Sequence, residues 1–360
     1  MTASPTARAI SSVLVTGGAG FIGSNFVRFL LRERPQWKVT NLDLLTYSGN
    51  LENLADVQDN PSYRFVKGDI CDRALVDGLL AEHDAAAHLA AESHVDRSIY
   101  DAGPFVRSNV LGTQTLLDAA RQAWDTGSAG GEKAGRFLHV STDEVYGSLP
   151  LDRPELMFTE DTPLGPHSPY SASKAASDLL VQACFHTHGL DASITRCSNN
   201  FGPWQFPEKV IPLFVTNLVQ GEPVPLYGDG LNVRDWLHVE DHCEALLAVL
   251  ERGSAGEVYN IGGNNERSNL ELTREILRLM GLEGPDADAM IRPVPDRLGH
   301  DRRYAIDATK IARDLGWRPT RSAWPAALEQ TVRWYRDNEP WWRRVRSGEY
   351  RAFCERQYGR

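Results

Sequence analysis

The chain is poor in cysteine, and its few cysteines are widely separated. It has 5 cysteines among 360 residues, with no CxxC pair and no Cys/His cluster. This spacing argues against a disulfide framework and against a structural zinc site, so no metal is expected. It fits reduced thiols in the cytosol.

Long apolar runs and excess positive charge are also missing. No run approaches the roughly 20 apolar residues of a membrane span, and the opening MTASPTARAI lacks the apolar segment of a signal peptide. We therefore expect a cytoplasmic protein with no membrane partner. The net charge is −10. A nucleic-acid partner is not expected, because phosphate binding requires clustered basic residues. The one basic and aromatic stretch, residues 341–360, is predicted to be an amphipathic helix that covers the core.

The first half of the chain alternates short apolar runs with amphipathic segments. Strands are predicted at 11–17, 37–43, 63–69, 84–91 and 135–142, and helices at 21–34, 71–83 and 105–124. Such alternation predicts an α/β fold with a Rossmann-like, doubly wound parallel sheet. After about residue 200, proline and glycine become frequent, which predicts a smaller α/β substrate lobe. We expect a first domain over 1–200, with a returning segment at about 233–255, and a mainly substrate-binding lobe over 201–360.

The segment TGGAGFIGS places Gly17, Gly20 and Gly23 between the first strand and the first helix. Three glycines alone indicate only a tight turn. In this context, however, the amides at the helix start can hold a pyrophosphate. Asp43 lies twenty residues after Gly23, where an acid bonds a ribose 2′-hydroxyl and repels a 2′-phosphate. These features predict a dinucleotide site that favours NAD over NADP, and residues 68–70 fit an adenine contact.

A tyrosine and a lysine in SPYSASKAASDLL are spaced for catalysis. Tyr170 and Lys174 are one helical turn apart and should share a face. An ordinary helix start with a solvated lysine is the simpler alternative. Here the pair follows a predicted dinucleotide-binding segment, which favours a catalytic role. The ammonium of Lys174 would lower the pKa of the Tyr170 phenol. Tyr170 could then take a hydroxyl proton while the cofactor takes a hydride.

Two adjacent carboxyls, Asp143 and Glu144, directly follow the apolar run 137–140 in STDEVYG. A polar loop after a strand is the ordinary interpretation, and acid–base chemistry is the other. Neighbouring side chains on a strand point to opposite sides, so a bend is needed to aim both at one ligand. The two pKa values must also differ for one group to be an acid and the other a base. Thr142 beside them can hydrogen-bond a substrate oxygen or its developing charge.

The motifs above resemble those of the extended short-chain dehydrogenase/reductase family, and within it the nucleotide-sugar 4,6-dehydratases. The resemblance covers nearly the whole chain, and it includes LTYSGNLENL, LAAESHVDRSI, CSNNFGPWQFPEKVIPL, RDWLHVEDH, YNIGG and GHDRRYAID. It implies an NAD-dependent lyase that converts dTDP-glucose to dTDP-4-keto-6-deoxyglucose and water. Tyr170 would then deprotonate the C4 hydroxyl, Glu144 would abstract the C5 hydrogen, and Asp143 would protonate the departing C6 hydroxyl.

Other activities of the same fold stay open. A UDP-glucose 4,6-dehydratase would differ only in the base of its substrate. A UDP-sugar 4-epimerase oxidises and reduces C4 without removing water, and it does not need the Asp143–Glu144 pair. A decarboxylase needs no acid for a leaving group at C6. A dinucleotide-sensing scaffold is the non-enzyme alternative, although such proteins usually lose the tyrosine or the lysine.

By matching motifs, the resemblance implies three sets of site residues. The catalytic set is Thr142, Asp143, Glu144, Tyr170 and Lys174. The NAD-binding set is Gly17, Gly20, Phe21, Ile22, Gly23, Asp43, Leu44, Thr46, Asp69, Ile70, Leu89, Ala90, Ala91, Ser93, Ser108, Tyr170, Lys174 and Asn200. The substrate-binding set is Ser93, His94, Thr142, Asn199, Glu208, Lys209, Val210, Pro225, Tyr227, Arg234, Asn269, Arg297, His300 and Tyr304.

Some members of the substrate-binding set also have simpler interpretations. Lys209 and Arg234 would neutralise the diphosphate, or they are solvated surface charges. His94 would face the ligand, or it caps a helix. The family usually has proline where this chain has Leu298, and commonly tyrosine where it has Trp204. The resemblance also implies a homodimer in which the helices at 105–124 and 170–187 form a four-helix bundle. The alternative is that both simply pack on the sheet.

Overall fold

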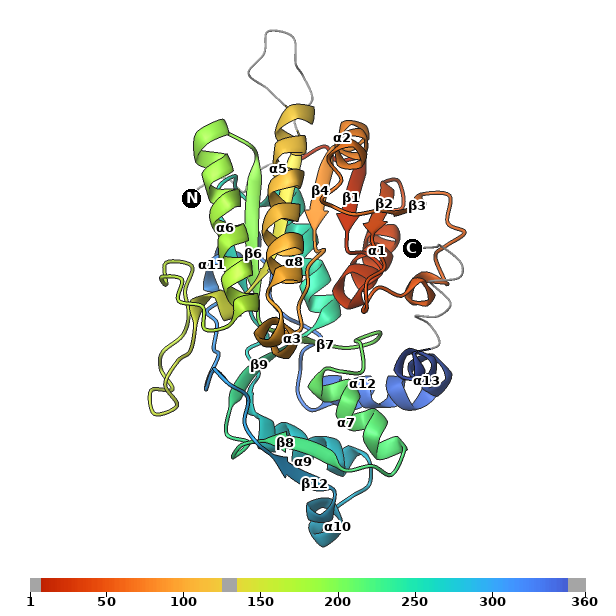
Figure 1. The fold of residues 1–360 in the computed structure, drawn as a ribbon, viewed down its shortest axis with the longest axis vertical. Helices are drawn as coiled ribbons and strands as arrows, with labels where there is room; N and C mark the ends of the chain where they lie inside the picture. The colour runs from red at the N-terminus through yellow and green to blue at the C-terminus, as the bar shows by residue number, and fades with distance from the viewer. Residues whose placement is uncertain (1–7, 125–134, 349–360) are drawn as a thin grey trace.

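A sheet of seven parallel strands, together with the helices that cover its two faces, forms the larger lobe of the protein (Figure 1). The computed structural model describes residues 8–124 and 135–348. The strand order is β10-β6-β5-β4-β1-β2-β3. The strands are β1 (Ser12–Thr16), β2 (Lys38–Asp43), β3 (Tyr63–Lys67), β4 (Ala85–His88), β5 (Arg136–Thr142), β6 (Ala192–Cys197) and β10 (Val258–Ile261). The five strands predicted in the first half of the chain are thereby confirmed, together with the doubly wound fold.

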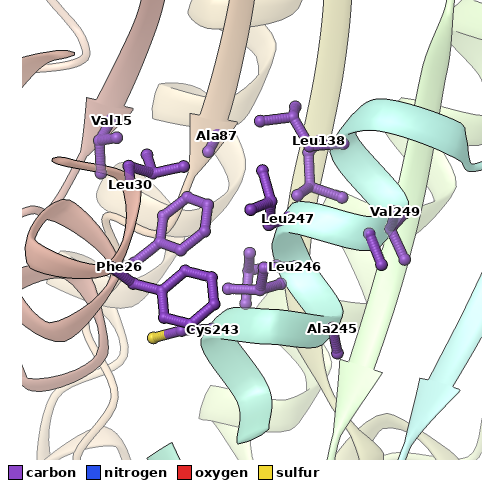
Figure 2. Packing of buried hydrophobic residues seen from close by; sticks show 14 of the residues in the cluster. Val15, Phe26, Leu30, Ala87, Leu138, Cys243, Ala245, Leu246, Leu247 and Val249 are labelled. Carbon is purple, nitrogen blue, oxygen red and sulfur yellow. The ribbon is translucent and has the colours of Figure 1, made fainter. Parts of the chain in front are cut away.

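The strands are apolar because both faces of the sheet are covered by helices. All seven residues of β5 are buried, as expected for a central strand of a parallel sheet. One face packs on α1 (Phe21–Glu33), α8 (Val239–Arg252) and α11 (Thr309–Leu315), and the other on α2 (Arg73–Glu82), α5 (Gly112–Ala123) and α6 (Pro169–His188). Figure 2 shows the first of these layers, where Phe26 and Leu30 of α1 meet Leu246 and Leu247 of α8.

The helix predicted over 105–124 is interrupted, and that prediction is corrected here. The chain forms a short turn, α4 (Gly103–Phe105), then a π-helical segment, η2 (Val106–Leu111), and only then α5. A π-helix has the wider i→i+5 hydrogen-bond spacing, and it often occurs beside functional sites. Here the widened turn carries Ser108, which lines the cavity described below. Hydrophobic periodicity does not distinguish the two helix types, because both bury the same face.

A second lobe is built from two small sheets and several helices, in the lower half of Figure 1. Its sheets are β11-β9-β7 and β12-β8. Their strands are β7 (Asn199–Phe201), β8 (Val224–Tyr227), β9 (Val233–His238), β11 (Glu266–Ser268) and β12 (Ile291–Val294). The helices are α7 (Val210–Val219), α9 (Asn269–Leu279), α10 (Gly284–Ala289), α12 (Ala326–Asp337) and α13 (Glu339–Ser347). A separate apolar cluster holds α7, α9, α12 and α13 together.

Three short elements complete the described chain near the edge of the large sheet. They are η1 (Leu51–Leu54), α3 (Val95–Tyr100) and η3 (Asp143–Tyr146). Within residues 8–124 and 135–348, no helix has both the length and the apolar character that crossing a membrane requires.

Candidate active site

A cavity of about 300 Å³ lies where the strands of the large sheet end. Residues at or just beyond the ends of β1, β2, β3, β4, β5 and β6 all line it, because parallel strands bring their carboxyl ends to one edge. All the residues predicted to bind NAD line this cavity, from the glycine-rich loop to Asn200. All five residues predicted to be catalytic do so as well. The structure therefore brings these two sets together.

The glycine-rich loop is shaped for close approach of a ligand to its backbone. Gly17 has φ +73°, and a Cβ atom there would lie 2.7 Å from Cα of Ala90. A Cβ atom on Gly23 would lie 2.1 Å from the carbonyl oxygen of Gly17. Side chains at these positions would collide with the backbone just after β4 and with that of the loop itself, so glycine lets the loop fold tightly against the start of α1. A tight turn at a helix start fits a pyrophosphate site.

Asp43 is fixed at the end of β2 by two backbone amides. Its Oδ2 accepts from the amide of Ala19 at 2.9 Å, and its Oδ1 accepts from that of Leu45 at 2.8 Å. Burial raises the pKa of Asp43, and the two amides act in the opposite direction. A carboxylate held in this way at the rim of the cavity fits the ribose contact predicted for it.

Tyr170 and Lys174 are both buried on the face of α6 that meets the cavity. Nζ of Lys174 donates to the carbonyl oxygen of Val140 at 2.8 Å. Burial lowers the pKa of Lys174 to about 8. Burial also raises the pKa of Tyr170 well above its ordinary value, and the charge of Glu144 raises it further. The sequence argument, in which Lys174 lowers the phenol pKa, is therefore corrected: burial dominates, and the hydrogen bond with Thr142 acts against it.

The bend that the two carboxyls require is present. β5 ends at Thr142, and the 3₁₀ turn η3 begins at Asp143. Oγ1 of Thr142 accepts from the amide of Glu144 at 3.3 Å, so Thr142 caps this turn. Because the backbone leaves the extended conformation here, Asp143 and Glu144 both line the cavity instead of pointing to opposite faces of the sheet.

The two carboxyls differ in burial and in their neighbours. Asp143 is 2% exposed. Burial raises its pKa well above the ordinary value, and the charges of Glu144 and Asp235 raise it further. Glu144 is only partly buried. Burial raises its pKa too, but the charges of three cations lower it, namely Arg297, Arg234 and Lys209. The environment thus favours a protonated Asp143 beside a Glu144 that ionises more easily, as an acid–base pair needs.

Several polar atoms of the cavity have no protein partner. Oγ of Ser141, Oδ2 of Asp143 and Oδ1 of Asn199 are buried without a hydrogen bond. Asn200 differs, because its Oδ1 meets Nδ1 of His242 at 2.9 Å and its Nδ2 donates to the carbonyl of Ser198 at 2.9 Å. Unpaired buried polar atoms are costly, so a polar ligand is the natural partner of the first three groups.

The residues predicted to bind the sugar nucleotide separate into two groups. Ser93, Thr142, Asn199, Glu208 and Lys209 line the cavity. The remaining nine lie outside its lining: His94, Val210, Pro225, Tyr227, Arg234, Asn269, Arg297, His300 and Tyr304.

Five of the nine outer residues form contacts with one another or with the cavity wall. The Arg234 guanidinium stacks on the ring of Tyr304 at 4.2 Å. The rings of Tyr227 and His300 are 6.2 Å apart. His94 caps α3, as the simpler interpretation held, and its Nε2 also lies 3.6 Å from Oε2 of Glu208 on the cavity wall.

The other four outer residues are spread over separate elements. Nε of Arg297 lies 3.8 Å from Oδ1 of Asp96 in α3. Val210 begins α7, Asn269 begins α9 and Pro225 lies in β8. Arg297 is nevertheless close enough to Glu144 for its charge to lower the pKa of that carboxyl.

Sequence reasoning missed several lining residues, including Tyr47, Glu92, Cys197, Gln205 and Phe206. Each lies inside a motif quoted above, but a motif does not say which of its side chains turns inward. Cys197 lines the cavity because it lies opposite Thr142 in the register of β5 and β6, and the structure is needed to show that register.

Asp143→Asn should raise the free energy of unfolding of the ligand-free protein at about pH 7. The raised pKa means that the native state retains a proton which the unfolded carboxyl has lost, and this costs stability as the pH rises above about 4. Each unit of pKa difference is worth about 1.4 kcal/mol. Urea unfolding followed by tryptophan fluorescence should show the gain at neutral pH and its loss as the pH falls to about 4. Glu144→Gln is the matched control, with a smaller gain. A lower stability for Asp143→Asn at neutral pH would contradict the assignment.

Comparisons with known proteins show the family of this chain. Residues 14–326 match the family model described as GDP-mannose 4,6 dehydratase. The dTDP-glucose 4,6-dehydratase of Streptomyces niveus is 55% identical over 93% of this chain and 96% of its own. The solved structure of a Streptomyces venezuelae dTDP-glucose 4,6-dehydratase is 52% identical, covers 93% of this chain and 99% of its own, and has a TM-score of 0.86. One from Bacillus anthracis is 48% identical, covers 93% and 99%, and has a TM-score of 0.83. The chain therefore belongs to the dTDP-glucose 4,6-dehydratase family.

Proposed function

We propose that the protein is an NAD-dependent hydro-lyase that converts dTDP-glucose to dTDP-4-keto-6-deoxyglucose and water. The main support for this proposal is that two carboxyls whose surroundings shift their pKa values differently, Asp143 and Glu144, line one cavity with Tyr170. A 4-epimerase would need the tyrosine without the pair, because it removes no water. The relatives of this chain that share about half of its sequence carry the same activity in their names.

NAD would occupy the cavity along the glycine-rich loop. The structures of the Streptomyces venezuelae and Bacillus anthracis relatives were solved with NAD bound. The pyrophosphate would lie at Gly17, Gly20 and Gly23, and the adenosine ribose at Asp43. We assign the NAD-binding role to residues 1–200 with a returning segment at about 233–255, and the substrate role mainly to residues 201–360. When bound, NAD supplies a hydride acceptor for C4 that returns the hydride to C6 within the same turnover.

Oxidation at C4 would begin at Tyr170. Its oxygen takes the proton of the C4 hydroxyl as the hydride leaves C4, and Thr142 hydrogen-bonds the oxygen that becomes the ketone. Because burial raises the phenol pKa, this step needs a positive charge near the Tyr170 oxygen that favours its phenolate. Lys174, on the same helix face, would supply that charge, and its hydrogen bond to the carbonyl of Val140 fixes its position.

Dehydration would use the two carboxyls in turn. The 4-ketone acidifies the C5 hydrogen, and Glu144 accepts it as a proton. The C6–oxygen bond then breaks, and Asp143 gives its proton to the departing hydroxyl, which leaves as water. The hydride is added to C6, and Glu144 returns a proton to C5. The environment of each group matches its task, because Asp143 is the more strongly protonated and Glu144 lies among cations.

The diphosphate of the substrate would be bound by the cations beyond the cavity. Lys209 lines the cavity, and its Nζ donates to the carbonyl of Ser93 at 3.1 Å. Arg234 is buried and held by Tyr304, and Nε of Arg297 is buried without a hydrogen bond. A doubly charged diphosphate would complete this group of cations, in which the two arginines can bind bidentately.

The reaction predicts a specific isotope pattern. The purified protein, incubated without added NAD with dTDP-glucose in deuterated water, should give a 4-keto-6-deoxy product with one deuterium at C5. NMR and mass spectrometry would show the label, because C5 is reprotonated from solvent-exchanged Glu144 while the hydride at C6 comes from C4. A galactose product instead would identify an epimerase. Reaction with UDP-glucose alone would overturn the assigned nucleotide. Repeating the incubation with added NAD controls for cofactor lost in purification.

Substitution of each of the three residues proposed to transfer protons should impair a different part of the reaction. Asp143→Asn should slow water loss more than C4 oxidation, by roughly 10²–10⁴-fold as for other general acids. Glu144→Gln should block exchange of the C5 hydrogen with solvent. Tyr170→Phe should stop all steps. Rapid-quench analysis of the sugar products would separate these effects. If Asp143→Asn slows every step equally, the division of labour is wrong.

We further propose that the protein forms a homodimer through η2, α5 and α6. These elements lie side by side on one face of the large sheet. Yet they also expose large apolar side chains: Val106 is 54% exposed, Leu111 50% and Leu179 55%. Helices that only packed on the sheet would present polar residues outward. A second copy of this surface would cover them in a four-helix bundle.

The double variant Leu111→Arg/Leu179→Arg should therefore convert a dimer to a monomer, because it places four cations in an apolar interface. Light scattering after gel filtration would report the mass. Leu298→Arg is the control, since Leu298 is 78% exposed in a loop of the second lobe. A monomeric wild-type protein would contradict the proposal.

A further inference from the structure

The helix predicted over 341–360 corresponds to α13, and residues 349–360 of that prediction lie outside the described residues. α13 does more than cover the core, the role predicted for it. Figure 1 shows α13 in the smaller lobe, on the side where the first strands of the large sheet lie. Trp341 is 5% exposed and packs against Trp204 and Trp334, with ring centroids 5.4 and 5.3 Å away. Arg344 forms hydrogen bonds to both carboxylate oxygens of Glu52, the shortest 2.7 Å long. The helix thus contacts η1, which follows the second strand of the large sheet.

A chain of three hydrogen bonds leads from α13 to the glycine-rich loop. Nε1 of Trp341 donates to Oδ1 of Asn53 at 3.1 Å. Nδ2 of Asn53 donates to the carbonyl oxygen of Ala19 at 3.0 Å. The amide of Ala19 donates to Oδ2 of Asp43 at 2.9 Å. Ala19 lies between Gly17 and Gly23, so the chain ends on the loop and on the carboxylate at the rim of the cavity.

The direction of this chain is fixed by chemistry. An indole nitrogen can only donate a hydrogen bond and a backbone carbonyl can only accept one, so the Asn53 amide has a single possible orientation. Asn53 is 2% exposed, and water therefore does not compete for its side chain. The Asn53 side-chain amide accepts one bond and donates the next, so these two bonds polarise one another and the loss of the first weakens the second.

The geometry points to Trp341 and Asn53 as positioning residues that hold the glycine-rich loop in the shape that retains the dinucleotide. This inference rests on the proposed function, because the proposed reaction reoxidises its cofactor in each turnover and gains from keeping it bound. Neither side chain lines the cavity. Both act through Ala19, whose carbonyl accepts from the Asn53 side chain and also from the amide of Asn50 at 3.0 Å, and whose amide donates to Asp43, so rotation of that part of the loop breaks three hydrogen bonds together.

Trp341→Phe tests the link, because it keeps an aromatic ring in the cluster and removes the donor. We expect the variant to release NAD about five to ten times faster than wild type, the effect of losing one buried hydrogen bond. The release would be measured by diluting the NAD-loaded protein and quantifying free NAD over time. Calorimetric titration of the stripped protein with NAD should show a matching loss of affinity.

Trp342→Phe is the matched control. Trp342 is its neighbour on α13, is fully buried, and donates to the carbonyl of Tyr335 at 2.8 Å, with no link to the loop. It should lower the thermal midpoint by a similar amount and leave NAD release within twofold of wild type. Equal release from the two variants would overturn the inference, because both would then act only through the packing of α13.

Asn53→Leu provides an independent test, because leucine has a similar shape and removes both the acceptor of Trp341 and the donor to Ala19. NAD release should be at least as fast as in Trp341→Phe, and release equal to wild type would overturn the inference. A wild-type protein that binds no NAD at all would instead overturn the proposed function, so the two failures are distinguishable.

Discussion

The meeting of six parallel strand ends at one buried edge is the constraint on which this site depends. In a parallel sheet covered on both faces, the strand interiors must be apolar, and polar groups gather where the strands stop. The glycine-rich loop, Asp43, Thr142 and Cys197 lie far apart in sequence, yet each follows or ends a strand of the same sheet. The cavity therefore exists because of the strand order, and hydrogen bonds to neighbouring groups hold some of its side chains in place, among them Asp43 and Lys174.

Burial at this edge sets the chemistry and also lowers the stability. It raises the pKa of Asp143 well above its ordinary value and lowers that of Lys174 to about 8. A buried carboxyl without a full set of partners costs free energy. The same low polarity favours the protonated form of Asp143, which the proposed role of general acid requires, while the positive charges near Glu144 lower the pKa of that carboxyl. Two adjacent carboxyls thus differ in how readily each gives up its proton.

Most of the fold could be predicted from sequence, because strand periodicity and turn chemistry are local, whereas the full set of residues expected to bind NAD came from the resemblance to a known family. The predictions at positions 17, 43 and 170–174 rested on spacings within one or two elements, and those residues line a single cavity. Prediction failed where the outcome depended on distant neighbours. The π-helical turn at Val106–Leu111 is invisible to periodicity. The pKa of Tyr170 was expected to fall because Lys174 is nearby in sequence, but burial by the whole fold raises it.

The parallel α/β architecture, the glycine-rich turn and the acid pair directly after a strand can all be read from the amino-acid sequence. They follow from local hydrophobic pattern and residue type, which need no knowledge of packing. Which carboxyl has the more strongly raised pKa, and which cations lie near Glu144, depends on the folded chain. The tertiary structure also decided that a tryptophan near the C-terminus hydrogen-bonds to the loop at Ala19 through Asn53. Electrostatic energies and hydrogen bonds depend on distances across the fold, and residues 288 positions apart become neighbours only when the chain has packed.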